Sequence, residues 1–436
     1  MQLITTHFVA LAALAVVACA PVSETGQQAD NLIGVTTITT LASRSGNFAD
    51  GDARRPALSD NRRFVAFDTG ASLAAGDVNF RRDVYLFDRN TQTVQRISVA
   101  APGGRDDGDS TNATVSSDGR FVAFESTADL TGELTTVTPP RPVGQVYRFD
   151  RVTGQTRLVS RGTIQLPNGT AAEPSISADG SRVAFSSTSS NISSEDTNTR
   201  SDIYVFVASI GGCLLMSKTT TTTTTAGVVG NGESFEPSLS ADGRVVAFTS
   251  TSTNFHGADF NNATDVFVYD SIAARNTLAS RSGTLLRRTA NGASREPSIS
   301  PNGLQVAFTS DGSDMVSGDT NLVSDVFVTT VASGSVERVS RPTGANTQFT
   351  TESSSPSMDD DFIAFENDGA IRVHDLFYGF TVTSTTLSDG NSPALRAIGR
   401  SGPFLEFDVA FATSARLDPI DTNNGSDVYV ASQRSL

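Results

Sequence analysis

The chain contains 436 residues with 47 acidic and 32 basic side chains, which gives a formal net charge of −15 at pH 7. This acidic balance argues against a nucleic-acid-binding protein, because nucleic acids are bound by basic surfaces. The hydrophobic content of 38% is enough for a packed core, whereas two Cys and three His exclude a disulfide scaffold, a Cys-based zinc module and a His-rich metal site.

The N-terminal segment has the features of an export signal. Residues 8–18 form an apolar run that is too short to span a bilayer as a helix. The run ends in Val16-Val17-Ala18-Cys19, which resembles a bacterial lipoprotein box, where cleavage precedes a Cys that is then lipidated. Ordinary cleavage after Ala20 is the alternative. We therefore expect a signal peptide over residues 1–18, lipidation of Cys19, and a polar tether over residues 19–34.

Residues 35–436 are built from one repeated unit. The marker of the unit is a Val/Ile-Ala-Phe triplet at intervals of 46 to 63 residues, which ends at Phe67, Phe124, Phe185, Phe248, Phe308, Phe365 and Phe411. Seven units fill this region, and nothing substantial is left for another domain. The sequence therefore predicts an all-β fold, a single seven-bladed β-propeller with four-stranded blades.

The third unit illustrates the four strands that we expect in each blade. They cover residues 174–177, 182–186, 202–207 and 213–218. Asp179-Gly180 separates the first two strands, and Asp-Gly between short apolar strands predicts a hairpin because Gly adopts the positive φ of a tight turn. The fourth strand contains Cys213, which we interpret as a buried small hydrophobic residue rather than a nucleophile.

Two units depart from the pattern. The second has a linker at residues 135–144 that contains two prolines, and the sixth is expected to be cut short because Phe365 lies only eight residues before Val373. The seventh unit stops after its third strand, whereas an unmatched strand over residues 36–45 precedes the first unit. Residues 41–46 are identical to residues 278–283, the end of the outer strand of the fourth unit. We therefore expect the N-terminal strand to complete the last blade and close the ring.

The repeat also resembles a known family. The segment from Glu236 to Phe248, and Asp319-Thr320-Asn321 leading into Asp325-Val326-Phe327-Val328, are similar to the WD-repeat-like propeller repeats of the TolB family. The similarity covers nearly the whole chain after the leader. It implies a propeller fold, a location in the bacterial cell envelope and a role in binding other molecules.

An Asp-x-Asn-x-x-x-Asp motif precedes the third strand of five units. It occurs as Asp77/Asn79/Asp83, Asp196/Asn198/Asp202, Asp259/Asn261/Asp265, Asp319/Asn321/Asp325 and Asp421/Asn423/Asp427. Carboxylate and amide oxygens on a tight loop are possible ligands of Ca²⁺, although three side chains fall short of the six to eight oxygens that it takes. The alternative is that these side chains bond their own backbone and shape the loops. Fivefold recurrence favours loop shaping, because a unique site would not be copied into five blades.

Catalytic patterns are sparse. No Gly-x-Ser-x-Gly elbow of a hydrolase is present, and His256 and His374 are interpreted as surface loop residues. Carboxylates at the mouth of the channel leave a polysaccharide-active enzyme as an alternative function.

The sequence favours an exported, monomeric envelope protein, periplasmic or lipid-anchored to the outer membrane. We expect it to be a non-catalytic scaffold that binds a protein or glycan partner, with no cofactor apart from possible Ca²⁺ and with the membrane contacted only through the anchor. The expected binding surface is the end of the ring that carries the long loops between second and third strands.

Overall fold

The computed structural model describes residues 36–41, 52–135, 144–220, 227–257, 259, 261–283, 288–342, 348–377, 379–386, 391–401, 404–414, 417 and 426–434. The regular secondary structure of these residues consists of β-strands only. The predicted signal peptide and tether, with Cys19, lie outside this part of the chain. Within it, no helix is long and apolar enough to cross a membrane.

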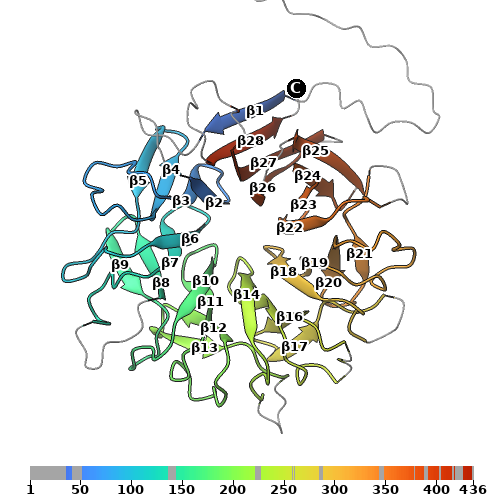
Figure 1. The fold of residues 1–436 in the computed structure, drawn as a ribbon, viewed down its shortest axis with the longest axis horizontal. Coiled ribbons are helices and arrows are strands. Elements are labelled where there is room, and N and C mark those ends of the chain that lie inside the picture. The colour runs from blue at the N-terminus through green and yellow to red at the C-terminus, as the bar shows by residue number, and fades with distance from the viewer. Residues whose placement is uncertain are drawn as a thin grey trace, which may run out of the picture.

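The described strands form seven antiparallel four-stranded sheets arranged around a common centre (Figure 1). From the innermost strand outwards, the first three are sheet 1 with β2 (Ala53–Leu58), β3 (Phe64–Thr69), β4 (Asp83–Asp88) and β5 (Thr93–Arg96), sheet 2 with β6 (Ser110–Val115), β7 (Phe121–Ser126), β8 (Gln145–Asp150) and β9 (Gln155–Leu158), and sheet 3 with β10 (Ala171–Ile176), β11 (Arg182–Ser187), β12 (Asp202–Val207) and β13 (Gly212–Leu215).

The next three follow the same order. They are sheet 4 with β14 (Ser234–Leu239), β15 (Val245–Ser250), β16 (Asp265–Asp270) and β17 (Arg275–Leu278), sheet 5 with β18 (Ser294–Ile299), β19 (Gln305–Ser310), β20 (Asp325–Thr330) and β21 (Val336–Arg338), and sheet 6 with β22 (Ser353–Met358), β23 (Phe362–Asn367), β24 (Ala370–Asp375) and β25 (Phe380–Thr386). Sheet 7 joins the two ends of the chain, with β26 (Asn391–Ser401), β27 (Phe404–Thr413), β28 (Asp427–Arg434) and, outermost, β1 (Thr36–Leu41).

The N-terminal strand closes the last sheet. β1 pairs antiparallel with β28, from Thr36 opposite Arg434 to Leu41 opposite Tyr429. Sheet 7 then packs against sheet 1, where Val428 and Val430 share a buried cluster with Phe67 and Tyr85. The all-β propeller of four-stranded blades is confirmed, and the outer edge of the last sheet is supplied by the strand that the sequence indicated.

Aromatic residues of the repeated triplet form the layers between sheets. The triplet Phe of the second strand stacks on the aromatic ring opposite it on the third strand, as in Phe185 on Tyr204, whose centroids are 5.9 Å apart. Five further sheets repeat the pair: Phe67–Tyr85, Phe124–Tyr147, Phe248–Phe267, Phe308–Phe327 and Phe411–Tyr429. Each buried ring contributes about 1.5–3 kcal/mol through the hydrophobic effect, so the triplet supplies much of the core.

Strand boundaries differ from the sequence prediction in two ways. In sheet 3, β10 begins at Ala171 rather than residue 174, because a bulge between Ala172 and Ser175 lets the pairing resume upstream. β13 ends at Leu215 because the next ladder bond is replaced by the hydroxyl of Ser217, which accepts the Ile203 N–H at 2.9 Å.

The prediction of a truncated sixth blade was wrong. Sheet 6 has all four strands, and only the connection between its second and third strands is reduced. That connection is the two-residue turn Asp368-Gly369, and both residues have positive φ, 53° and 66°. This is the geometry of a tight hairpin, so a short spacing in the sequence reflects a lost loop and not a lost strand.

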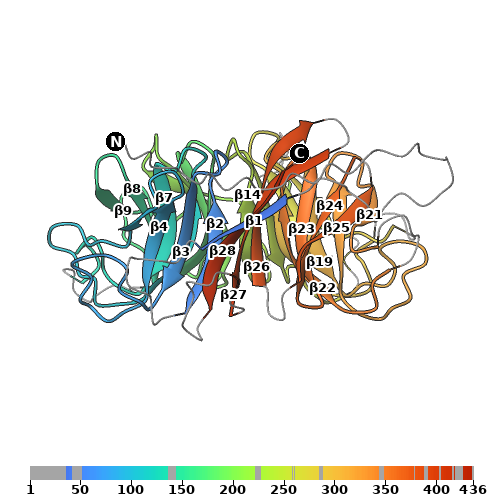
Figure 2. The ribbon, with the colours of Figure 1, turned by 90° about the horizontal axis from the view of Figure 1, so that it is seen from above.

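The ring has two different ends, between which the strands run when the molecule is seen edge-on (Figure 2). We call one the turn face, because it carries the tight turns from innermost to second strands, such as residues 59–63 and 177–181. We call the other the loop face, because it carries the longer connections from second to third strands, such as residues 70–82 and 311–324.

Candidate functional site

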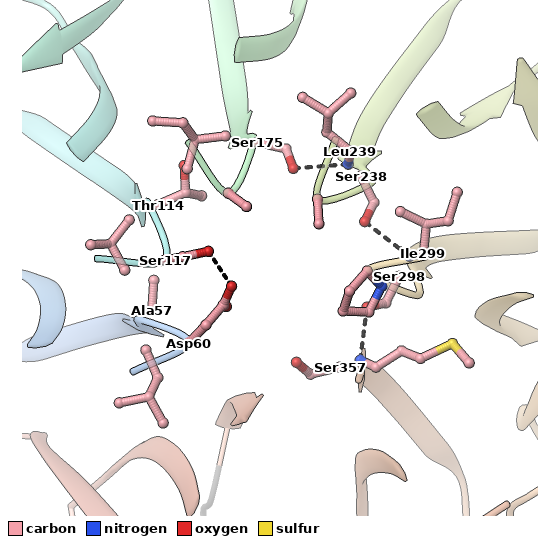
Figure 3. A pocket seen from close by; sticks show the side chains of 17 residues that line it. Ala57, Asp60, Thr114, Ser117, Ser175, Ser238, Leu239, Ser298, Ile299 and Ser357 are labelled. Atoms are coloured by element: carbon pink, nitrogen blue, oxygen red, sulfur yellow. Dashed lines mark hydrogen bonds between the residues drawn. The ribbon is translucent and has the colours of Figure 1, made fainter. Parts of the chain in front are cut away.

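A hollow of about 190 Å³ lies at the turn face, between the innermost strands (Figure 3). It is lined by the ends of the innermost strands of sheets 1 to 6 and by their turns. The lining alternates aliphatic side chains with hydroxyls, and Asp60 is the charged side chain among the described residues that line it. This end of the ring is opposite to the one where the sequence placed the binding surface.

Serine hydroxyls in this hollow fasten each innermost strand to the next. The Oγ of Ser175 accepts the Leu239 N–H of the neighbouring sheet at 3.0 Å, and Ser238 and Ser298 repeat the contact with the following sheets at 3.0 and 2.9 Å (Figure 3). These serines follow the Pro of the repeated Glu-Pro-Ser sequence. Because their hydroxyls are already engaged by backbone amides, they serve the structure of the channel rather than a nucleophilic reaction.

A second set of contacts, which we call carboxylate clips, joins the bulges of adjacent innermost strands. The Oε2 of Glu173 accepts the Glu236 N–H of the next sheet at 2.8 Å, Glu236 accepts the Glu296 N–H at 2.8 Å, and Glu296 accepts the Ser355 N–H at 2.9 Å. Each donor residue has positive φ at the bulge of its innermost strand, which turns its amide away from the sheet ladder. The clip therefore supplies the partner that this amide would otherwise lack.

In sheets 1 and 2 the carboxylate comes from the second strand instead. Asp68 accepts the Asn112 N–H at 3.5 Å, and Glu125 accepts the Glu173 N–H at 3.4 Å. Burial raises the pKa of Asp68, Glu125 and Glu236, while the hydrogen bonds that these carboxylates accept act in the opposite direction. These acids consequently hold adjacent sheets together near their innermost strands.

On the loop face, the side chains of the Asp-x-Asn-x-x-x-Asp motifs form hydrogen bonds that hold the loops in place in each sheet where they are described. In sheet 3, Asp196 accepts the Tyr204 hydroxyl at 2.6 Å, and Asp202 accepts the Ser217 hydroxyl at 2.6 Å. Between them, the Asn198 amide donates to the Gly230 carbonyl of the connection to sheet 4 at 2.9 Å. The motif thus ties the third strand to the fourth strand and to the next sheet.

The same amide-to-carbonyl contact recurs around the ring. Asn79, Asn261 and Asn321 donate to the carbonyls of Asp106, Ala290 and Phe349, all at 2.9 Å. Sheet 2 lacks the motif, and Gln145 replaces it by donating to the Gly169 carbonyl at 2.7 Å while its own oxygen accepts from Ser160. These contacts agree with the loop-shaping interpretation of the motif.

The Ca²⁺ candidates are distributed over separate sheets. Asp319, Asn321 and Asp325 belong to sheet 5, and Arg338 approaches both of its carboxylates, at 3.4 and 3.9 Å. Asp427 begins β28, whereas Asp421 and Asn423 lie outside the described residues. In the described part of the chain, no group of three or more His, Cys, Asp or Glu side chains is arranged to hold a metal ion.

The two His residues considered for catalysis differ in their burial. His374 lies in β24 and is fully buried, with Nδ1 at 2.9 Å from the Thr381 hydroxyl, so the prediction of a surface loop residue was wrong for it. Burial lowers the pKa of His374 to about 4. His256 lies in the loop-face connection of sheet 4, as expected, and is half-buried.

Cys213 behaves as a packed thiol. Its Sγ donates to the carbonyls of Val159 and Arg161 at 3.3 and 3.1 Å, in the sheet before its own. Burial raises the pKa of this thiol to about 12. A thiol that stays protonated is a poor nucleophile, so this environment favours the packing role that the sequence suggested.

Two exposed apolar side chains at the loop face were not identified from the sequence. Phe80 and Leu322 occupy the same position of the Asp/Asn motif in sheets 1 and 5, and they are 98% and 88% exposed. Both have positive φ, 58° and 60°, where a bulky side chain is strained by about 1 kcal/mol or more. In sheet 4 the position holds Asn262, a residue type suited to this conformation. Alignment of the repeats would have revealed the two apolar residues, although not their backbone strain.

Comparisons with known proteins assign no family to this chain. No protein-family model and no curated protein matches the sequence. Solved structures that are similar include TolB from Agrobacterium tumefaciens, with 15% identity, a TM-score of 0.39, and coverage of 70% of this chain and 88% of that one. TolB from Acinetobacter baumannii is similar with 14% identity, a TM-score of 0.36, and coverage of 88% and 79%.

A prolyl endopeptidase structure is also similar, with 12% identity, a TM-score of 0.49 and coverage of 89% of this chain but only 50% of that one. TolB proteins thus stand among the structures that this β-propeller resembles, as the repeat sequence suggested.

Proposed function

We propose that this protein is a non-catalytic scaffold that binds a partner protein through its loop face, and that its seven sheets are the blades of one closed seven-bladed ring. The observation that carries the proposal is the pair of strained, exposed side chains Phe80 and Leu322. Backbone strain of this kind persists only where the surrounding structure imposes it, and it is concentrated at functional sites. An apolar side chain at such a tip gains about 2 kcal/mol when a partner covers it.

The channel gives less support to the rival function, a polysaccharide-active enzyme. Glycoside hydrolysis uses two carboxyl groups that flank the scissile bond. Among the described residues that line the axial hollow, Asp60 alone has a carboxyl group, and it accepts a hydrogen bond from Ser117. The carboxylates of the clips on the innermost strands are engaged by backbone amides of adjacent sheets.

The experiment is site-specific photo-crosslinking in the envelope fraction of the native host. A photoreactive residue at position 80 or 322 is expected to capture the same partner, and Ile272 is the matched control because it is 76% exposed on the turn face. The Phe80→Asn/Leu322→Asn variant should weaken binding to that purified partner at least tenfold without loss of thermal stability, because Asn tolerates positive φ. Equal capture at position 272, or unchanged affinity of the double variant, would contradict the proposal.

Export and anchoring complete the proposal. The leader over residues 1–18 supports export, and Cys19 at the end of its apolar run supports lipid modification. Intact mass and membrane partitioning of protein expressed with its own leader test both points. A diacyl- or triacyl-modified Cys19 in the membrane fraction is expected, whereas a soluble chain that starts beyond Cys19 would refute the anchor.

A further inference from the structure

The loop-face carboxylate pairs are neutralised in some sheets by an Arg of the fourth strand. In sheet 1, Arg96 lies 3.7 Å from Asp77 and 3.2 Å from Asp83. In sheet 5, Arg338 lies 3.4 Å from Asp319 and 3.9 Å from Asp325. A positive charge therefore sits beside both members of the pair, as buried carboxylates require.

Sheets 3 and 4 lack this Arg. The strand register places Arg96 opposite Tyr85 and Arg338 opposite Phe327, and the corresponding residues of the other two sheets are Leu215 opposite Tyr204 and Leu278 opposite Phe267. The carboxylate pairs are nevertheless retained, as Asp196/Asp202 and Asp259/Asp265. A leucine cannot offset their charge.

A second partner is also missing in sheet 4. The first Asp of the motif accepts a tyrosine hydroxyl in sheets 1 and 3, from Tyr85 and Tyr204. In sheet 4 the equivalent residue is Phe267, which has no hydroxyl. Of the four motifs described in full, sheet 4 alone has neither the Arg nor the Tyr.

The last Asp of the motif has an unpartnered Oδ2 in both sheets without the Arg, Asp202 in sheet 3 and Asp265 in sheet 4, and sheet 4 adds a second unpartnered oxygen on Asp259. Asp265 is 1% exposed, and its Oδ2 has no hydrogen-bond partner, while Oδ1 accepts the Ser280 hydroxyl at 2.7 Å. Asp259 Oδ1 is also buried without a partner. In sheets 1 and 5 the second oxygen of the last Asp receives the motif Asn amide at 3.0 and 2.8 Å, but in sheet 4 Asn261 turns to Oδ1 at 3.4 Å instead.

We propose that Asp259 and Asp265 of sheet 4 bind a hard divalent cation, of the Ca²⁺ class, at the place that the guanidinium of Arg96 or Arg338 takes in sheets 1 and 5. Hard cations of this class are coordinated by oxygen ligands, and Asp259 and Asp265 each present a buried carboxylate oxygen that has no hydrogen-bond donor. The two acids repel each other, and each has a buried oxygen without a donor. A cation between them would remove both penalties, and this is the source of its binding free energy. The site is distinct from the exposed tips of sheets 1 and 5 and stands independently of the partner proposal.

The test compares the wild type with two variants, using Ca²⁺ itself as the probe. Thermal unfolding is followed at pH 8 in EDTA and in millimolar CaCl₂, and bound Ca²⁺ is counted by equilibrium dialysis with elemental analysis. Binding at a hundredfold excess over the dissociation constant should raise the Tm of the wild type by roughly 3–5 °C. Leu278→Arg installs the guanidinium of sheets 1 and 5 and should abolish that response by occupying the site.

Asp259→Asn provides the second variant, because Asp259 is half-buried and its replacement leaves the Asp265–Ser280 contact intact. It should also lose one bound Ca²⁺ per chain and the corresponding shift in Tm. Converse evidence comes from Arg338→Leu in sheet 5, which should create a new dependence on Ca²⁺. A wild-type Tm that is indifferent to CaCl₂ would overturn the proposal and point to a shared proton, and so would a Ca²⁺ response that survives unchanged in Leu278→Arg and Asp259→Asn.

Discussion

Replacement of Glu236 with alanine removes the carboxylate that joins sheet 4 to sheet 5. Its Oε2 accepts two hydrogen bonds at 2.8 Å, from the Thr249 hydroxyl and from the Glu296 N–H. The Thr249 hydroxyl can reorient, but the Glu296 amide is fixed by its bulge and is left without a partner. An unsatisfied buried donor costs about 1–3 kcal/mol, and the relief of a carboxylate whose pKa burial has raised offsets part of it.

We therefore expect Glu236→Ala to lower the free energy of unfolding by about 2 kcal/mol and Glu236→Gln by about 1 kcal/mol. Urea-induced unfolding followed by circular dichroism measures the global effect. Amide hydrogen exchange gives the local one, because the Glu296 N–H should lose its protection in Glu236→Ala while amides of sheet 1 keep theirs.

A transposed variant separates the clip from a general effect of the mutation. Glu236→Asn combined with Thr249→Glu copies the arrangement of sheet 2, where Asn112 holds the bulge and Glu125 supplies the carboxylate. It should recover about half of the lost stability, because the sheet 2 contact is longer, 3.4 Å against 2.8 Å. If Glu236→Ala unfolds like the wild type, or if the transposed variant is no more stable than Glu236→Ala, the clip does not join the sheets energetically.

Two further predictions concern buried positions. His374 is neutral in the folded state because its pKa is lowered to about 4, whereas the unfolded chain takes up a proton below about pH 6.5, so the free energy of unfolding should fall by about 3 kcal/mol between pH 6.5 and pH 4. The free energy of unfolding, measured by urea denaturation at several pH values in that range, should depend less on pH for His374→Phe than for the wild type. Identical pH profiles would contradict this assignment. Gly119 has φ +74°, and an added Cβ would lie 2.0 Å from the Phe64 ring, whereas at Gly154, with φ +69°, it would meet nothing within 4 Å. Gly119→Ala should therefore cost about 3 kcal/mol and Gly154→Ala about 1 kcal/mol in urea unfolding, and equal losses would show that the ring moves aside freely.

The fold could be predicted from the sequence because its signals are local and repeated. The triplet ending at Phe185, the turn at Asp179-Gly180 and the strand that starts at Asp202 all fall within about thirty residues, and each unit repeats them. Strand boundaries were less accurate because the bulge between Ala172 and Ser175 leaves no clear mark in the pattern. Sheet 6 was misjudged because the spacing of residues does not distinguish a missing strand from a missing loop.

The contacts at the candidate site were beyond the reach of that reasoning. Glu236 meets the Glu296 amide sixty residues later, and no local pattern marks this pair. In the sequence Phe80 is an ordinary apolar residue, and only the structure shows that it has positive φ and is almost fully exposed. Leu278 and Arg338 occupy equivalent positions of the fourth strand. Their equivalence could not be recognised from the sequence, because it depends on the strand register that the structure provides.

Each carboxylate clip joins two repeats. One repeat supplies the carboxylate that accepts the hydrogen bond, and the next supplies a backbone N–H, which every residue except proline possesses. The residue that donates this N–H therefore varies, and it is Asn112, Glu236 or Ser355 in different sheets, each with the positive φ of the bulge. A repeat that is duplicated or lost in evolution would still find an acceptor before it and a donor after it. The joint between neighbours thus requires a carboxylate from one repeat but only a bulge conformation from the next, which leaves the loop tips free to diversify while the ring keeps its geometry.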